Sequence, residues 1–402
     1  MDPGTSRSAG ADLPTCYRDG YARARALDPE VAANYVAHTR IGDPVADAMM
    51  AALEELGPRE SWRIVQAAMD NLDDESALND APREVRDFFE ELKTPPAWVD
   101  EASLIPGMRM FHRNSRIILG AFVGGTLVEG FATNISKSFF TTGRLREQGV
   151  RRLKQNNRHM LEMFVPGGMD RGGDGWKLSV RVRMVHAQVR RLLANSGDWD
   201  FDELGEPVSA AHLGFAITAF SARLLKHMKS LGTVYDDEER ASFMQVWRYG
   251  GYLMGIPESI LYRDEAEALR IFEIGGICEP EPDFECIAMA NSLINSAPLL
   301  IGLTDPEERR HLAKYVYRVS RALIGKELAN KLKYPGGPTV GVLPWFRMQG
   351  RIERTLGRLF HKHLQQTNYT NLTSLLEVSV FDEAGISYKM PDHVYAEEST
   401  KW

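Results

Sequence analysis

Apolar residues recur every three or four positions along most of the chain, which is the spacing of amphipathic helices. The segment DPVADAMMAALEEL at 43–56 also carries start signals, because Asp43 suits a helix N-cap and Pro44 suits the first helical position. The same period runs through five further segments, at 60–72, 84–92, 212–228, 239–254 and 307–332. No stretch offers several alternating runs joined by hairpin turns. The sequence therefore predicts an all-α fold.

Short loops rich in proline and glycine separate these helical segments, at 92–100, 165–175, 277–286 and 333–344. Loops this short favour one large helical domain over separable domains. We place that domain at 34–335, after an N-terminal extension at 1–33 and before a C-terminal helical segment and tail at 336–402 that packs on it. The apolar run at 117–132 is short for a membrane span and contains Glu129, so it predicts a buried helix and no transmembrane segment.

Composition narrows the function classes. The formal net charge of −7 over 402 residues argues against a general nucleic-acid binder, which needs a basic face. Three cysteines are too few for a disulfide scaffold, although a single Cys278–Cys286 bridge fits the count. The first sixteen residues hold no apolar leader. We expect a cytoplasmic protein, or a secreted one if the chain is a mature form, that is a monomer or weak oligomer.

One histidine stands out because of its neighbours. In VRVRMVHAQVRRLLANSG, residues 180–197, His186 lies at the edge of an apolar helix face, with Arg183 and Arg190 one turn away on either side. A core histidine satisfied by its neighbours explains this pattern. An axial ligand also explains it, because a haem needs an apolar slot, an imidazole for iron and guanidinium groups for its propionates. Both interpretations stay open on these residues alone.

Two other features carry candidate chemistry. Glu129 lies in the most apolar helix, where a carboxylate must be hydrogen-bonded or protonated unless it reaches solvent at the helix end. The basic segment at 143–164 places Arg151, Lys154 and Gln155 within one turn, beside a row of apolar positions. A solvated helix face explains that basic segment equally well.

Several segments in order resemble a known family: NYVAHTRIGDPVADAMMAAL, PPAWVD, TTGRL followed by RRLK, the His186 helix, FSARLLKHMKSLG and WRYGGYLMGIPESIL. They are similar to the latex clearing protein and MpaB-type oxygenases, which are all-helical haem b proteins. The resemblance runs from about Asn34 to about Pro335. It implies a globin-like helical core around haem b with additional helices outside it.

The resemblance also implies roles for individual residues. It makes His186 the proximal iron ligand. In the rubber-cleaving members an Arg-x-x-Lys-Thr run supplies the distal side, and Arg151 and Lys154 match it, with Lys154 a possible sixth iron ligand. Gln155 stands in the threonine position, where a bulkier amide would reshape the oxygen pocket or substrate channel. Glu129 is the best-placed candidate for the family's distal glutamate base.

The implied activity is cleavage of isoprenoid C=C bonds, in cis-1,4-polyisoprene or a related chain, with dioxygen to give carbonyl products. The partners are then dioxygen and a hydrophobic isoprenoid. Two alternatives remain open: haem-dependent oxidation of a prenylated or polycyclic small metabolite, and a haem-binding protein without turnover. The missing leader favours a small substrate over an extracellular polymer.

Overall fold

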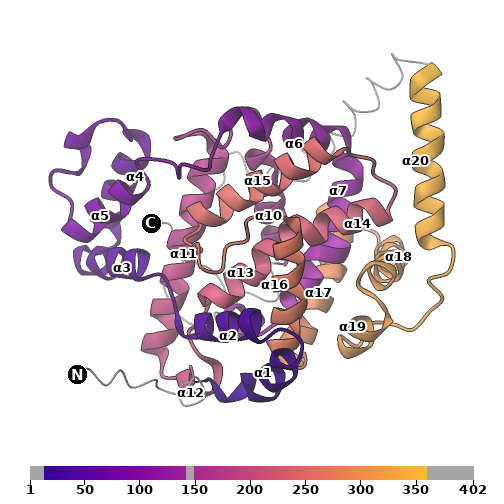
Figure 1. The fold of residues 1–402 in the computed structure, drawn as a ribbon, viewed down its shortest axis with the longest axis horizontal. Coiled ribbons are helices and arrows are strands. Elements are labelled where there is room, and N and C mark those ends of the chain that lie inside the picture. The colour runs from indigo at the N-terminus through magenta and orange to yellow at the C-terminus, as the bar shows by residue number, and fades with distance from the viewer. Residues whose placement is uncertain (1–12, 142–148, 360–402) are drawn as a thin grey trace.

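A computed structural model describes residues 13–141 and 149–359 (Figure 1). All regular elements in these ranges are helices, so the predicted all-α fold is confirmed. The body is one helical assembly in which α13 and α16 lie near the centre of the view. The expected tail beyond about residue 368 lies outside the described residues.

The N-terminal third forms an outer layer and a lobe. Helices α1 and α2 pack on α16, and α3 packs on α11 and α5. In Figure 1, α3, α4 and α5 form the lobe at the left of the body. The elements are η1 (Thr15–Tyr17), α1 (Arg18–Arg25), α2 (Pro29–Ala37), η2 (His38–Arg40), α3 (Pro44–Leu56), α4 (Pro58–Asp70), η3 (Glu75–Leu78) and α5 (Arg83–Glu91).

The central helices supply most of the core. Helix α6 packs along α15, and α10 lies against both α11 and α17. Two π-helical turns, η4 and η5, interrupt long helices and contact each other. The elements are α6 (Glu101–Arg113), α7 (Ser115–Ala121), η4 (Phe122–Thr126), α8 (Leu127–Phe131), α9 (Ile135–Thr141), α10 (Gly149–Met163), α11 (Asp174–Ser196), α12 (Phe201–Leu204), α13 (Ala210–Thr218), η5 (Ala219–Arg223), α14 (Leu224–Ser230) and α15 (Asp237–Leu253).

The remaining helices close one side of the body: α16 (Glu265–Cys278), α17 (Phe284–Leu300), α18 (Pro306–Ile324), α19 (Lys326–Lys331) and α20 (Val342–Leu359). The single helix predicted over 307–332 is two helices, because Gly325 adopts a φ of 89° that ends α18. A positive φ costs glycine little, so the chain turns there.

Local signals behave as the sequence predicts at α3. The Asp43 carboxylate accepts a hydrogen bond from the Ala46 backbone N–H at 3.2 Å, and Pro44 occupies the first helical position. The proposed domain start, residue 34, falls inside α2, and the proposed domain end, residue 335, lies between α19 and α20.

Two further expectations meet the structure here. The three cysteines are free, so the Cys278–Cys286 bridge is not formed; the Cys286 thiol instead donates to the Thr133 carbonyl at 3.3 Å. Within the described ranges no single helix could cross a membrane by length and apolar composition, although the bent pair Ser115–Phe131 and Ile135–Thr141, with a 90° break, passes when taken together.

Candidate active site

An apolar cavity of about 160 Å³ opens between α8, α10, α11 and α13. Five aromatic side chains line it: Phe122, Phe131, Phe139, Phe220 and Trp247. Phe220 lies beside two of them, because its ring centroid is 5.6 Å from that of Phe122 and 5.4 Å from that of Trp247. A mostly apolar lining with a few polar groups is typical of small-molecule sites.

His186 lies in the wall of this cavity. The 3.6-residue repeat of α11 places Val182, Val185 and His186 on the side that faces it, and all three line it. The His186 side chain is half-buried, while the residues before and after it, Val185 and Ala187, are buried. The predicted apolar slot beside this imidazole is therefore present.

A second imidazole, His159 of α10, lines the same cavity and was not singled out from the sequence. The Ser179 hydroxyl donates to the Gly175 carbonyl at 2.8 Å, so it accepts from His159 Nε2, also at 2.8 Å. This arrangement puts the ring proton on Nε2 and leaves Nδ1 as the acceptor nitrogen. Burial lowers the pKa of His159 to about 4, so the ring is neutral at pH 7.

The two histidines are the ionisable side chains among the described residues that line the cavity. Ser179, which holds His159, precedes His186 by seven residues on α11, or roughly 10 Å of helix. The cavity wall therefore carries one imidazole from α10 and one from α11. A signal existed in the sequence, because His159 follows Gln155 by four positions and shares its helix face.

The predicted distal residues differ in whether they line the cavity. Gln155 lines the cavity, together with Asn156. Lys154 is half-buried on the same helix and is not among the lining residues described. Arg151 belongs to α10, but its side chain lies outside the described residues. The structure thus brings Gln155 to the same cavity as His186, and the roles of Arg151 and Lys154 stay predictions.

Arg183 and Arg190, which were expected to bind cofactor propionates, are not among the residues that line the cavity. The Arg183 guanidinium donates to both Asp43 carboxylate oxygens, at 2.6 and 2.9 Å, and to Glu91 at 3.0 Å. Arg190 donates to Asp47 at 2.7 Å. Both arginines are buried, so these carboxylates of the lobe neutralise them and fix α11 against α3.

Glu129 is buried, as its position in an apolar helix indicated, but it does not line this cavity. Its carboxylate accepts from Arg223 Nε at 3.0 Å and from His227 Nε2 at 3.0 Å. Burial alone would raise the pKa of Glu129, but the His227 and Arg223 side chains outweigh it and lower the pKa to about 2. The carboxylate is held by Arg223 and His227 and is not among the residues that line the cavity, and the role of Glu129 as the base stays a prediction.

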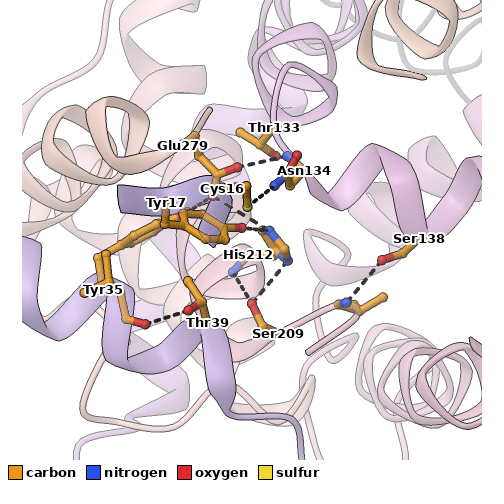
Figure 2. Close-up of polar contacts among 12 residues, drawn as sticks. Cys16, Tyr17, Tyr35, Thr39, Thr133, Asn134, Ser138, Ser209, His212 and Glu279 are labelled. Atoms are coloured by element: carbon orange, nitrogen blue, oxygen red, sulfur yellow. Dashed lines mark hydrogen bonds and ion pairs between the residues drawn. The ribbon is translucent and has the colours of Figure 1, made fainter. Parts of the chain in front are cut away.

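A second buried polar group includes His212 of α13 (Figure 2). Tyr35 donates its hydroxyl to Glu279 at 2.7 Å, and the Asn134 backbone N–H donates to the other Glu279 oxygen at 2.9 Å. The His212 ring lies 2.8 Å from the Tyr17 hydroxyl and 3.1 Å from the Ser209 hydroxyl. Burial raises the pKa of Glu279 to about 7 and lowers that of His212 to about 3. We call Tyr17, Tyr35, His212 and Glu279 the polar cluster.

The cavity residues fit a haem in chemical type. A flat apolar macrocycle needs apolar and aromatic walls, and its iron needs a neutral imidazole. Both are present, and the cavity wall also includes Trp247, whose indole N–H is buried without a hydrogen-bond partner among the described residues. No group of three or more His, Cys, Asp or Glu side chains is arranged for a metal ion by itself in those ranges.

Comparison with known proteins assigns the family. A model of the catalytic domain described as "ER-bound oxygenase mpaB/B'/Rubber oxygenase" matches residues 108–355, more than half of the chain. The chain belongs to this oxygenase family. The match includes η4, α10 and α11, which contribute to the cavity. The resemblance noted in the sequence is thereby confirmed.

Comparison with two known proteins shows how distant their relationship to this chain is. The rubber oxygenase of Streptomyces sp. (strain K30) is 23% identical over 236 residues, which cover 55% of this chain and 54% of that protein. The alignment thus spans about half the length of that curated relative. The solved structure of latex clearing protein in the closed state matches with a TM-score of 0.62 at 20% identity, over 88% of this chain and 95% of that chain. It confirms the fold.

Proposed function

We propose that this oxygenase uses haem b and dioxygen to cleave C=C bonds of an isoprenoid, giving carbonyl products. Family membership supports the reaction class. The observation that carries the proposal is the imidazole of His186 in the wall of an apolar cavity, in which the two histidines are the ionisable side chains among the described lining residues. When bound, haem would supply the reactions with dioxygen and the one-electron transfers that amino-acid side chains cannot carry out.

The chain's own residues would bind and position the substrate. His186 would hold the iron through a ring nitrogen. The walls formed by Phe122, Phe220 and Trp247 would bind the apolar isoprenoid chain and exclude water from the reacting bond. Gln155 offers both an amide donor and a carbonyl acceptor at the cavity surface, where it would orient a polar atom of the substrate or product.

Proton transfer would use His159. Its Nδ1 is the acceptor nitrogen, since Nε2 donates to Ser179. A pKa of about 4 keeps that nitrogen unprotonated and available at neutral pH, and it also makes the ring a weaker base than a free imidazole. The proposal thus gives His159 the role that the resemblance implies for Glu129. As the resemblance implies, Arg151 would stabilise the negative charge that develops on oxygen. Lys154 would act as a gate, held at the iron when the site is closed and withdrawn when it opens.

Two measurements test the proposal. The absorption spectrum of the purified chain, after reconstitution with hemin and before and after dithionite, should show a Soret band that shifts on reduction. Oxygen uptake is then followed with cis-1,4-polyisoprene latex and with farnesol, and carbonyl products are identified by mass spectrometry. Uptake with farnesol alone would assign a small isoprenoid substrate. A Soret band without uptake on either substrate would contradict the oxygenase proposal and leave a haem carrier.

A further inference from the structure

One donor in the cavity wall, the indole N–H of Trp247, lacks an acceptor. Trp247 is buried, and its Nε1 has no hydrogen-bond partner among the described residues. Two other indole N–H groups have one: Trp98 donates to Glu258 at 2.7 Å, and Trp199 donates to the Gly205 carbonyl at 2.9 Å. A buried donor without an acceptor is uncommon in native proteins, because it has given up its hydrogen bond to water. The Trp247 N–H therefore needs an acceptor from another source.

The cavity is the space from which that acceptor can come. Trp247 is one of the residues that line it. The indole also contacts two aromatic rings, Phe164 with 6.1 Å between ring centroids and Phe220 with 5.4 Å, which restrict its movement. A ligand in the cavity can therefore bring an acceptor atom to a ring that is already held in place.

The walls of the cavity differ in polarity. The residues that α10 contributes are all polar, namely Gln155, Asn156 and His159. The lining residues from η4, α8, α9, α13 and η5 are all apolar. A few polar groups in an otherwise apolar site typically fix the orientation of a ligand. This division fits a ligand with an apolar chain and one polar group.

The charge of the walls limits what that polar group can be. No lysine, arginine, aspartate or glutamate is among the described lining residues. His159 is neutral at pH 7, because burial lowers its pKa to about 4. A phosphate or carboxylate placed here would lose its hydration without gaining a counter-charge, which is strongly unfavourable. The acceptor is therefore a neutral oxygen.

We propose that the substrate is a neutral isoprenoid that carries oxygen, such as a prenyl alcohol, and that Trp247 Nε1 donates a hydrogen bond to this oxygen. The inference rests on the proposed function, because it takes the cavity as the substrate site. A polyisoprene hydrocarbon offers no acceptor, and a prenyl diphosphate carries charge. Trp247 is then a specificity-determining residue, since a ligand without the oxygen leaves its N–H unpaired.

Binding calorimetry tests the proposal without turnover. The full chain is reconstituted with hemin, kept ferric and free of dioxygen, and titrated with geraniol and with its deoxy analogue, a hydrocarbon of the same chain and double bonds. Each dissociation constant is corrected for the ligand's partition between water and hexadecane. Wild-type protein should then prefer geraniol at least roughly tenfold, and Trp247→Phe should lower this preference about tenfold, the effect of one buried hydrogen bond. Geranyl diphosphate should bind more weakly than geraniol.

Trp199→Phe is the matched control, because Trp199 is also buried but is not among the lining residues. It should keep the wild-type preference. Equal corrected affinities in the wild type, or no binding of geraniol, would overturn the proposal whether or not the variants fold, since water would then satisfy the N–H. So would a Trp247→Phe protein that keeps the preference but binds hemin more weakly, because the N–H would then belong to a cofactor carboxylate.

The same titrations on the chain as purified separate this proposal from the haem proposal. A missing Soret band after reconstitution would contradict haem binding. The preference for geraniol and its loss in Trp247→Phe would still be measured, because calorimetry detects the ligand and not the cofactor.

Discussion

Helix α13 contributes to two buried regions that use histidine differently. Leu213, Ala216 and Ile217 line the cavity whose wall also contains His159 and His186. His212 belongs to the polar cluster, where each of its ring nitrogens meets a hydroxyl group (Figure 2). Both regions bury imidazoles and keep them neutral. The difference lies in what the ring nitrogens face.

In the polar cluster the hydrogen bonds join distant parts of the chain. Tyr17 and Tyr35 come from the N-terminal elements, His212 from α13 and Glu279 from the end of α16. Buried polar groups that are fully hydrogen-bonded specify how elements pack and leave no atom for chemistry. In the cavity His159 donates from Nε2 to the Ser179 hydroxyl, and its Nδ1 is the acceptor nitrogen. Fully hydrogen-bonded polar groups thus indicate a structural role, whereas an imidazole in an apolar wall that hydrogen-bonds through one nitrogen and keeps the other as an acceptor indicates a candidate site.

The largest expected difference comes from replacing one histidine of each region, the cavity and the polar cluster, with alanine. His186→Ala should abolish haem binding with little loss of stability, because the ring borders a void. His212→Ala should keep full haem stoichiometry but lower the free energy of unfolding by about 3 kcal/mol, since the Tyr17 and Ser209 hydroxyls lose their partner. The Soret absorbance per protein and urea unfolding measure the two effects. A His186→Ala protein with an unchanged Soret band would remove the proposed ligand.

A second substitution concerns Glu129, whose buried carboxylate accepts hydrogen bonds from Arg223 and His227. Glu129→Gln should lower stability at pH 7 by about 3 kcal/mol, because the Arg223 guanidinium, stacked over Phe272 at 4.8 Å, loses its counter-charge in a buried setting. Oxygen uptake should persist in the fraction that stays folded. The pKa of Glu129 is lowered to about 2 from 4.5, so its contribution is present above pH 4.5 and is lost as the pH falls toward 2.

The surface pair Glu60–Arg63 supplies the control for that exchange. Both side chains are exposed, so Glu60→Gln should leave the free energy of unfolding unchanged. Equal changes in the free energy of unfolding for the two substitutions would mean that the contacts among Glu129, Arg223 and His227 do not hold α8 against η5 and α14. Loss of oxygen uptake in folded Glu129→Gln protein would support Glu129 as the base instead of His159.

A third prediction concerns pH and the polar cluster. The pKa of Glu279 is raised to about 7 from 4.5, so the folded protein holds this proton more tightly than the unfolded chain does. The stabilisation is complete below pH 4.5, falls as the pH rises to about 7, and is absent above it. The change amounts to about 3 kcal/mol. Glu279→Gln should flatten this part of the curve of unfolding free energy against pH. A slope that survives the substitution would have to come from another group.

The sequence predicted some of these features because their causes are local. The helical period, the Asp43 cap with Pro44 after it, and the apolar face at His186 all depend on residues within a few turns. The partners of Arg183 could not be predicted, because Asp43 lies 140 positions away and its spacing identified it only as a cap. Asp43 performs both tasks, capping α3 with one oxygen and pairing Arg183 with both.

Other contacts near the site also join residues that are distant in the sequence. Glu129 and Arg223 are 94 positions apart, so nothing local showed that the carboxylate would be neutralised. His159 lies among polar neighbours in the sequence, and only the packing of α10 on α11 shows that its ring enters the cavity and bonds Ser179. Local periodicity shows which side of a helix is buried. It does not show whether that side meets a salt bridge, a hydroxyl or a void.

The smallest expected effect separates two neighbours on α10. Gln155 lines the cavity and Lys154 is not among the lining residues, so Lys154→Ala should leave the resting absorption maximum where it is. Gln155→Ala should instead change the affinity for added imidazole, because the amide borders the space an added ligand would enter. Titration of both variants with imidazole, followed in the visible spectrum, makes the comparison. A shifted maximum in Lys154→Ala would show that the lysine nitrogen reaches the iron at rest. The gate that the resemblance implies would then be closed in solution, and the side of α10 that carries Lys154 would belong to the site.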